Sequence, residues 1–108
     1  MHSIRRLGTM IIVALDLFSA GLADKPANTY TVIIKNFVFA PDHLTASVGD
    51  TVVWKNEDSV PHTATGKDIF DSKEIDSMQT WSYKTGRKGT FSYTCTYHPF
   101  MHGELTVQ

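Results

Sequence analysis

Apolar and polar residues alternate along most of the chain with a period of two. Phe91, Tyr93 and Cys95, for example, share one side of a stretch that has polar residues between them. The alternating stretches are 30–35, 51–56, 80–84, 90–95 and 104–107. A period of two is typical of β-strands with one buried face, because successive side chains point to opposite faces of a sheet. The pattern therefore predicts an all-β domain.

Turn-forming residues separate these stretches. They cluster around Pro41, Gly49, Asn56, Gly66 and the 86–89 segment, where Gly, Pro, Asn and Asp favour turns. No helical stripe is evident after residue 23, although 66–79 fits a loop, a short strand or a helical turn. Many short, closely spaced strands predict a β-sandwich or small barrel of about 7–8 strands.

The first 23 residues have a different character. Arg5 and Arg6 form a basic start, an apolar run covers 7–15, and small residues follow up to Ala23. This order is typical of a secretory signal peptide. A membrane anchor is disfavoured, because a span needs roughly 20 apolar residues and Asp16 interrupts this run. We therefore expect a signal peptide over 1–23 and one domain over 24–108, periplasmic or secreted, without stable membrane insertion.

The composition excludes several classes of protein. The chain has 108 residues, 10 basic and 11 acidic side chains, and a single cysteine. This balance of charge leaves no electrostatic footprint for nucleic acid. One cysteine forms neither an internal disulfide nor a four-thiolate zinc or iron–sulfur site. A domain of about 85 residues without disulfides is so small that a bound metal is the next candidate for stabilising it.

Three potential metal ligands lie within seven residues, between two of the predicted strands: Cys95, His98 and Met101. Hard cations such as calcium prefer oxygen ligands, and zinc accepts thiolate and imidazole but rarely a thioether. Copper uses all three, in a plane of two His and one Cys with a weak axial Met. His62 is the favoured second imidazole, with His43 as its rival. We predict one copper ion bound by His62, Cys95, His98 and Met101.

Each of these residues also has a simpler interpretation when it is taken alone. A single cysteine on a strand is ordinarily a small buried apolar residue or a stray thiol, and a methionine ordinarily fills a core. A single histidine is more often a surface residue than a ligand. The conjunction of thiol, imidazole and thioether beside Pro99, in a chain with no other cysteine, favours metal binding over these alternatives.

The sequence resembles the cupredoxins, a family of small blue copper proteins. The similarity is strongest in 48–54, in Pro61-His62, and in 95–103 with its Cys-x2-His-x2-Met spacing. The short spacing is similar to that of the amicyanin group, which has Pro at the position of Tyr97 and Arg at that of His102. The resemblance implies a Greek-key β-sandwich, a type 1 copper centre with the four ligands above, and one-electron transfer.

From these observations we expect an electron shuttle rather than an enzyme. A four-ligand site leaves no open position, whereas a catalytic metal needs one. A copper enzyme would also need further histidines, and after residue 23 His43 and His102 alone are spare. The alternative is a copper carrier or buffer that delivers the ion rather than electrons. We expect a monomer that docks transiently with a donor and an acceptor redox protein near His98, Pro99 and Phe100.

Further expectations concern the surroundings of the site. The backbone N–H groups of Tyr97 and Thr63 are expected to donate to the Cys95 sulfur. Phe100 belongs to a surface patch or, alternatively, packs inward. His102 is expected in solvent, with a pH-sensitive contact or a second metal site as alternatives. A solvated loop is favoured over an acidic docking patch for the cluster Asp68, Asp71, Glu74 and Asp76.

Overall fold

The computed structural model describes residues 25–108, so the signal peptide predicted over 1–23 lies outside the described residues. Within 25–108 the chain forms strands and turns, without a helix. This part of the chain therefore holds no helix that is long and apolar enough to cross a membrane. The all-β prediction is confirmed for the described residues.

The described residues form nine strands. They are β1 (Thr29–Lys35), β2 (Val38–Ala40), β3 (His43–Ala46), β4 (Thr51–Asn56), β5 (Thr65–Gly66), β6 (Phe70–Asp71), β7 (Thr80–Lys84), β8 (Gly89–Thr94) and β9 (His102–Val107). The five alternating stretches correspond to β1, β4, β7, β8 and β9. The other four strands have two to four residues each, too few for an alternating pattern to be evident. The 66–79 segment holds the end of the β5–β6 hairpin and an irregular stretch.

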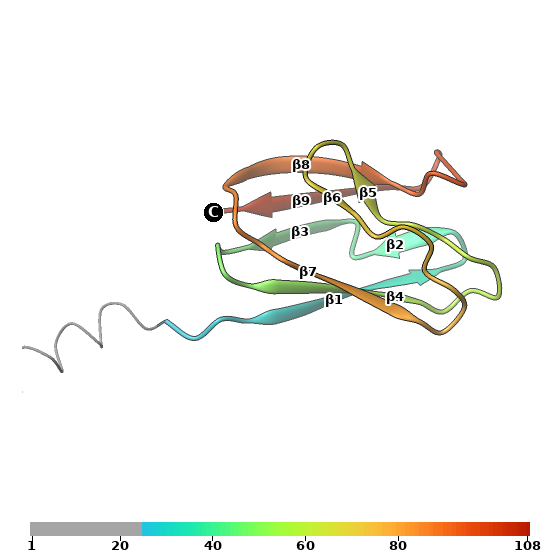
Figure 1. The fold of residues 1–108 in the computed structure, drawn as a ribbon, viewed down its shortest axis with the longest axis horizontal. Coiled ribbons are helices and arrows are strands. Elements are labelled where there is room, and N and C mark those ends of the chain that lie inside the picture. Colours follow the sequence, from blue (N-terminus) through green and yellow to red (C-terminus); the bar gives the residue numbers. More distant parts are fainter. Residues whose placement is uncertain (1–24) are drawn as a thin grey trace, which may run out of the picture.

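The strands form two sheets that pack face to face as a sandwich (Figure 1). One sheet has the order β2-β1-β4-β7, and the other has the order β3-β9-β8-β5-β6. β1 pairs with β4, and β3 with β9, in parallel, while the remaining pairs are antiparallel. The antiparallel strands β8 and β9 are consecutive in the chain, so the loop that joins them stays at one end of the sandwich.

The core lies between the two sheets, where the inward-facing residues of the alternating strands meet. Val32 and Ile34 of β1 and Trp54 of β4 are fully buried. The Trp54 ring packs against Phe70 at 5.1 Å and Tyr93 at 5.4 Å between ring centroids. These contacts join the first sheet to the second, since β4 belongs to one sheet and β6 and β8 to the other. The predicted inward face of each long strand is therefore the one that packs into the core between the sheets.

The β8–β9 loop and the β1–β2 turn lie at the same end of the sandwich (Figure 1). The β3–β4 connection lies at the opposite end, where the N–H of Val48 donates to the carbonyl of Gln108. The segment between β4 and β5 carries His62, which forms an isolated bridge with Ile75. The N–H of His62 donates to the Ile75 carbonyl at 3.1 Å, and the reverse bond is 2.7 Å. This bridge fixes the backbone of His62.

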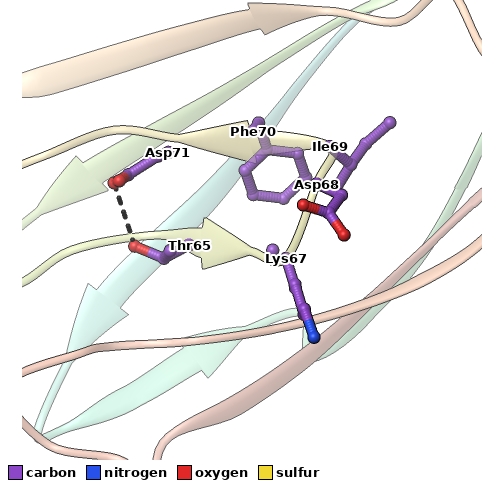
Figure 2. Close-up of a pocket in the computed structure, with 7 residues that line it drawn as sticks. Thr65, Lys67, Asp68, Ile69, Phe70 and Asp71 are labelled. Carbon is purple, nitrogen blue, oxygen red and sulfur yellow. Dashed lines mark hydrogen bonds between the residues drawn. The ribbon is translucent and has the colours of Figure 1, made fainter.

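The β5–β6 hairpin borders a hollow of about 320 Å³, lined by residues 65–71 (Figure 2). Thr65 and Asp71 face each other across the hairpin, and the Thr65 hydroxyl donates to the Asp71 carboxylate at 3.2 Å. Lys73 forms an ion pair with Asp71 at 3.2 Å. The predicted acidic cluster is exposed, and this pairing agrees with a solvated hairpin.

Asp50 holds the turn before β4 through two backbone hydrogen bonds. Its Oδ1 accepts from Asn28 N–H at 2.9 Å and its Oδ2 accepts from Ser47 N–H at 2.8 Å. These bonds, the one from Asn28 foremost, lower the pKa of Asp50 from its ordinary value of 3.8. A carboxyl group with a lowered folded-state pKa stabilises the fold above its ordinary pKa, and this contribution is lost as the pH falls through the lowered value.

Asp50→Asn is therefore expected to lower the melting temperature at neutral pH, because an amide oxygen accepts one of the two bonds and the amide N–H₂ cannot accept the other. The difference from the parent protein should shrink as the pH falls below about 4, where the carboxyl group becomes protonated in the unfolded chain, and should be lost as the pH falls through the lowered pKa of the folded state. Thermal denaturation across this pH range is the measurement. A difference in melting temperature that stays constant down to about pH 2 would contradict the assignment of this stabilisation to the Asp50 carboxylate.

Candidate metal centre

The four predicted ligands come from two segments at one end of the sandwich. His62 lies in the β4–β5 connection, and the other three lie in or beside the β8–β9 loop: Cys95 directly follows β8, and Met101 directly precedes β9. Two successive turns shape this loop, with His98 N–H donating to the Cys95 carbonyl at 3.2 Å and Met101 N–H to the His98 carbonyl at 2.9 Å. The x2 spacings thus correspond to two consecutive i→i+3 turns.

Three donor atoms converge on one point. The Cys95 Sγ lies 3.5 Å from His98 Nδ1 and 3.7 Å from His62 Nδ1, and the two nitrogens are 3.1 Å apart. The ligand atoms of these three residues all lie within 4.8 Å of one another, and no other such group of His, Cys, Asp and Glu occurs in residues 25–108. Met101 is 2% exposed and ends the same loop. The structure therefore gathers the residues that the spacing predicts.

The rival histidine lies elsewhere. His43 is on the exposed side of β3, where its Nδ1 is 3.1 Å from Asp42 Oδ1 and its Nε2 is 3.7 Å from Glu104 Oε1. The first of these contacts raises the pKa of His43 above 6.5. His102 is exposed at the start of β9, as expected. His62, and not His43, accompanies Cys95.

The Cys95 sulfur is buried and accepts one backbone hydrogen bond. Thr63 N–H donates to Sγ at 3.3 Å, which confirms the expectation for Thr63. The Thr63 hydroxyl oxygen also accepts from Thr96 N–H at 2.9 Å, so the His62 and Cys95 segments are joined directly. The prediction for Tyr97 is wrong: within residues 25–108, Thr63 N–H donates to this sulfur and Tyr97 N–H does not. In the first i→i+3 turn it is His98 N–H that points back toward Cys95, and it donates to the Cys95 carbonyl oxygen rather than to the sulfur.

His62 is oriented by a carboxylate that the sequence did not indicate. His62 Nε2 lies 2.8 Å from Asp58 Oδ2, so the tautomer protonated at Nε2 donates to Asp58 and leaves Nδ1 free beside Cys95. Burial alone would raise the pKa of Asp58, but hydrogen bonds from Phe37 N–H, Asn36 N–H and His62 outweigh it, and the pKa lies below its ordinary value. A carboxylate behind a metal-binding histidine fixes its tautomer and ring orientation.

Aromatic rings surround the outer side of the two histidines. Phe37 is 39% exposed and Phe100 is 63% exposed, and the two rings stack at 6.2 Å. The alternative in which Phe100 packs inward is therefore wrong. Tyr97 is also exposed, and its hydroxyl donates to Glu74 at 2.9 Å, which raises the pKa of Tyr97. The partly buried His98 thus sits within an apolar surface.

A family model described as a cupredoxin-like domain matches residues 8–107. The chain belongs to the cupredoxin-like family. Among the curated relatives of this cupredoxin, amicyanin of Paracoccus versutus is 30% identical over 92 residues, covering 80% of this chain and 70% of the relative. Plastocyanin of Vicia faba is 32% identical over 89 residues, covering 64% of this chain and 86% of the relative.

Solved cupredoxin structures have the same fold. A purple cupredoxin from Nitrosopumilus maritimus is 29% identical with a TM-score of 0.68, covering 73% of this chain and 99% of that one. The Cu(I) form of an amicyanin mutant is 28% identical with a TM-score of 0.71, covering 80% of this chain and 88% of that one. The predicted Greek-key, cupredoxin-like β-sandwich is confirmed.

The donor atoms of this cupredoxin fit copper. Two imidazole nitrogens and a thiol sulfur lie together in a buried position, with a buried thioether in the same loop. This soft and borderline set favours copper over oxygen-preferring cations. Family membership and the His62–Cys95–His98 cluster together confirm the predicted copper cofactor.

Proposed function

We propose that this cupredoxin shuttles single electrons between redox proteins in the periplasm, with one type 1 copper ion held by His62, Cys95, His98 and Met101. The observation that carries the proposal is the burial of three of the four donor residues: His62 and Cys95 are 0% exposed and Met101 is 2% exposed, while His98 is partly buried. A catalytic metal needs an open coordination position, and a donor set buried in this way favours transfer over catalysis. The predicted signal peptide supports the periplasmic location.

Bound copper supplies one-electron chemistry by cycling between Cu(I) and Cu(II). The residues of the chain keep the ligand atoms in place during that cycle. Asp58 orients His62 through Nε2, and Thr63 N–H stabilises negative charge on the Cys95 sulfur. The hydrogen bond between Thr96 N–H and the Thr63 hydroxyl ties the two ligand segments together. These contacts would hold the donor side chains in one arrangement while copper supplied its one-electron chemistry.

Addition of Cu(II) to the purified protein tests this function. We expect an intense blue thiolate-to-copper absorption band, a narrow parallel hyperfine splitting, and reversible one-electron cycling with the copper retained. The alternative function, a copper carrier or buffer, predicts transfer of the ion to a chelator within seconds. Burial of the donor atoms opposes such rapid release. A protein that binds copper without the band, or loses it on each reduction, would refute the shuttle.

The docking surface of the shuttle lies around His98, Pro99 and Phe100, and Phe37 extends it. Pro99 and Phe100 are exposed beside the partly buried His98, and Phe37 stacks on Phe100. A small apolar patch around a ligand suits the transient encounter of a monomeric carrier with its donor and acceptor, which buries less than about 1,200 Å².

Phe100→Glu is expected to slow electron transfer to the natural partner at least about tenfold, because a charged side chain at the centre of an apolar contact is desolvated on docking. The copper absorption band should stay unchanged, since Phe100 is exposed and supplies no ligand atom. Stopped-flow transfer rates measure the effect. Val48→Glu is the matched control, because Val48 is 46% exposed at the opposite end of the sandwich. Equal rates for the two variants would contradict this docking surface.

A further inference from the structure

The β1–β2 turn has an unusual residue in a demanding backbone conformation. Lys35 pairs with Val38, so Asn36 and Phe37 form a two-residue loop. Both have positive φ, +54° for Asn36 and +61° for Phe37, as a type I′ turn requires, and Asn-Gly is the preferred pair there. A bulky side chain at positive φ is unfavourable for the backbone. Some other interaction therefore has to favour phenylalanine at this position.

The turn is attached to the metal centre by one carboxylate. Asp58 Oδ1 accepts from Asn36 N–H at 2.7 Å, and Oδ2 accepts from Phe37 N–H at 3.0 Å. The same Oδ2 lies 2.8 Å from His62 Nε2. The position of the turn backbone is therefore coupled to the orientation of the His62 ring.

The Phe37 ring contacts both histidines of the donor cluster. Its centroid lies 5.0 Å from that of His62 and 4.8 Å from that of His98, with interplanar angles of 87° and 82°. Edge-to-face packing of this kind is a preferred geometry for aromatic rings. A single side chain thus packs against two imidazoles that come from segments far apart in the sequence.

We propose that Phe37 is a positioning residue of the metal centre, kept at an unfavourable backbone position because its ring fixes the planes of the His62 and His98 imidazoles. The inference rests on the proposed ligand roles of these two histidines. Phe37 contacts the two histidine rings and has no donor atom of its own, so it acts by restricting the rotation of those rings. The strained turn places the Phe37 ring over both histidines, and Asp58 holds that turn in place.

Phe37→Gly tests the contribution of the ring separately from that of the turn backbone. Glycine suits the positive φ better than phenylalanine does, so the turn should form, while the packing against the histidines is lost. We expect the copper(I) affinity to fall about tenfold, a loss typical of residues that orient metal ligands. We also expect the ring-proton NMR signals of His62 and His98 in the copper(I) protein to shift and broaden.

Asn36→Gly is the matched control. It relaxes the neighbouring residue with positive φ and keeps the backbone N–H that donates to Asp58. It also leaves the Phe37 ring in place. We expect parent-like affinity and histidine signals. Phe37→Leu is the second variant: it keeps a bulky side chain without a planar ring, and we expect a smaller loss of affinity with shifted histidine signals.

Three results would overturn the proposal. If Phe37→Gly matches Asn36→Gly in affinity and in the histidine signals, the positioning role fails and the proposed function stands. If the glycine variant does not fold, Phe37→Leu replaces it. Copper(I) affinity and histidine signals like those of the parent protein in Phe37→Leu would also mean that the positioning role fails and the proposed function stands. A parent protein that forms no thiolate-to-copper band overturns both the function and this inference.

Discussion

Cys95→Ser is expected to abolish the visible absorption of the copper protein and to weaken copper(I) binding more than 100-fold. The band requires a thiolate on the metal, and Cys95 is the only cysteine in the chain. Loss of residues that merely orient ligands costs about 10–100-fold in metal affinity, so the loss of the thiol that we propose as a ligand should cost more. Absorption spectra and competition with a copper(I) chelator measure the two effects.

The control for this prediction is His43→Ala. His43 is the second histidine that the sequence offered as a ligand, and it lies on the exposed side of β3 beside Glu104. Its replacement should change neither the band nor the affinity. A copper band that survives in Cys95→Ser, or that disappears in His43→Ala, would show that the ligand set is wrong.

The features predictable from the sequence are those that depend on neighbouring residues. Alternation identified the long strands, because the side-chain period of a strand is a local property. The β8–β9 loop was also readable, since its x2 spacings correspond to two local turns between Cys95 and Met101. The choice of His62 over His43 relied on position relative to the predicted strands, and the structure agrees.

The features that the sequence did not indicate depend on contacts between distant segments. Asp58 accepts a hydrogen bond from the N–H of Asn36, which lies 22 positions earlier in the chain. Nothing in the sequence of the 56–59 turn indicates that contact. Phe37 reads as an ordinary apolar residue until the β1–β2 turn is placed over the histidines. The wrong assignment for Tyr97 has the same origin, because closeness in sequence to Cys95 does not determine where an N–H points.

Gly103→Ala is expected to destabilise the protein by about 3 kcal/mol or more, at the upper end of the cost of inserting a methyl group into a packed core. Gly103 of β9 pairs directly with Tyr93 of β8, and a Cβ at Gly103 would overlap the Tyr93 ring. That ring cannot easily move away, because it packs against Phe39 at 4.8 Å and Trp54 at 5.4 Å. Such a loss is a large fraction of the stability of a small domain.

The effect should reach the copper centre as well. Tyr93 lies two residues before Cys95 on the same face of the strand, and Gly103 lies two residues after Met101. A displaced Tyr93 therefore shifts both ends of the β8–β9 loop. Urea unfolding of the metal-free and copper-loaded protein measures the loss. Gly86→Ala is the control, since a Cβ there meets no atom within 4 Å, and a surface change of this kind stays within about 0.5 kcal/mol. Equal stability of the two alanine variants would mean that the Tyr93 ring moves aside without cost, and that the close packing of β8 on β9 does not restrain the β8–β9 loop.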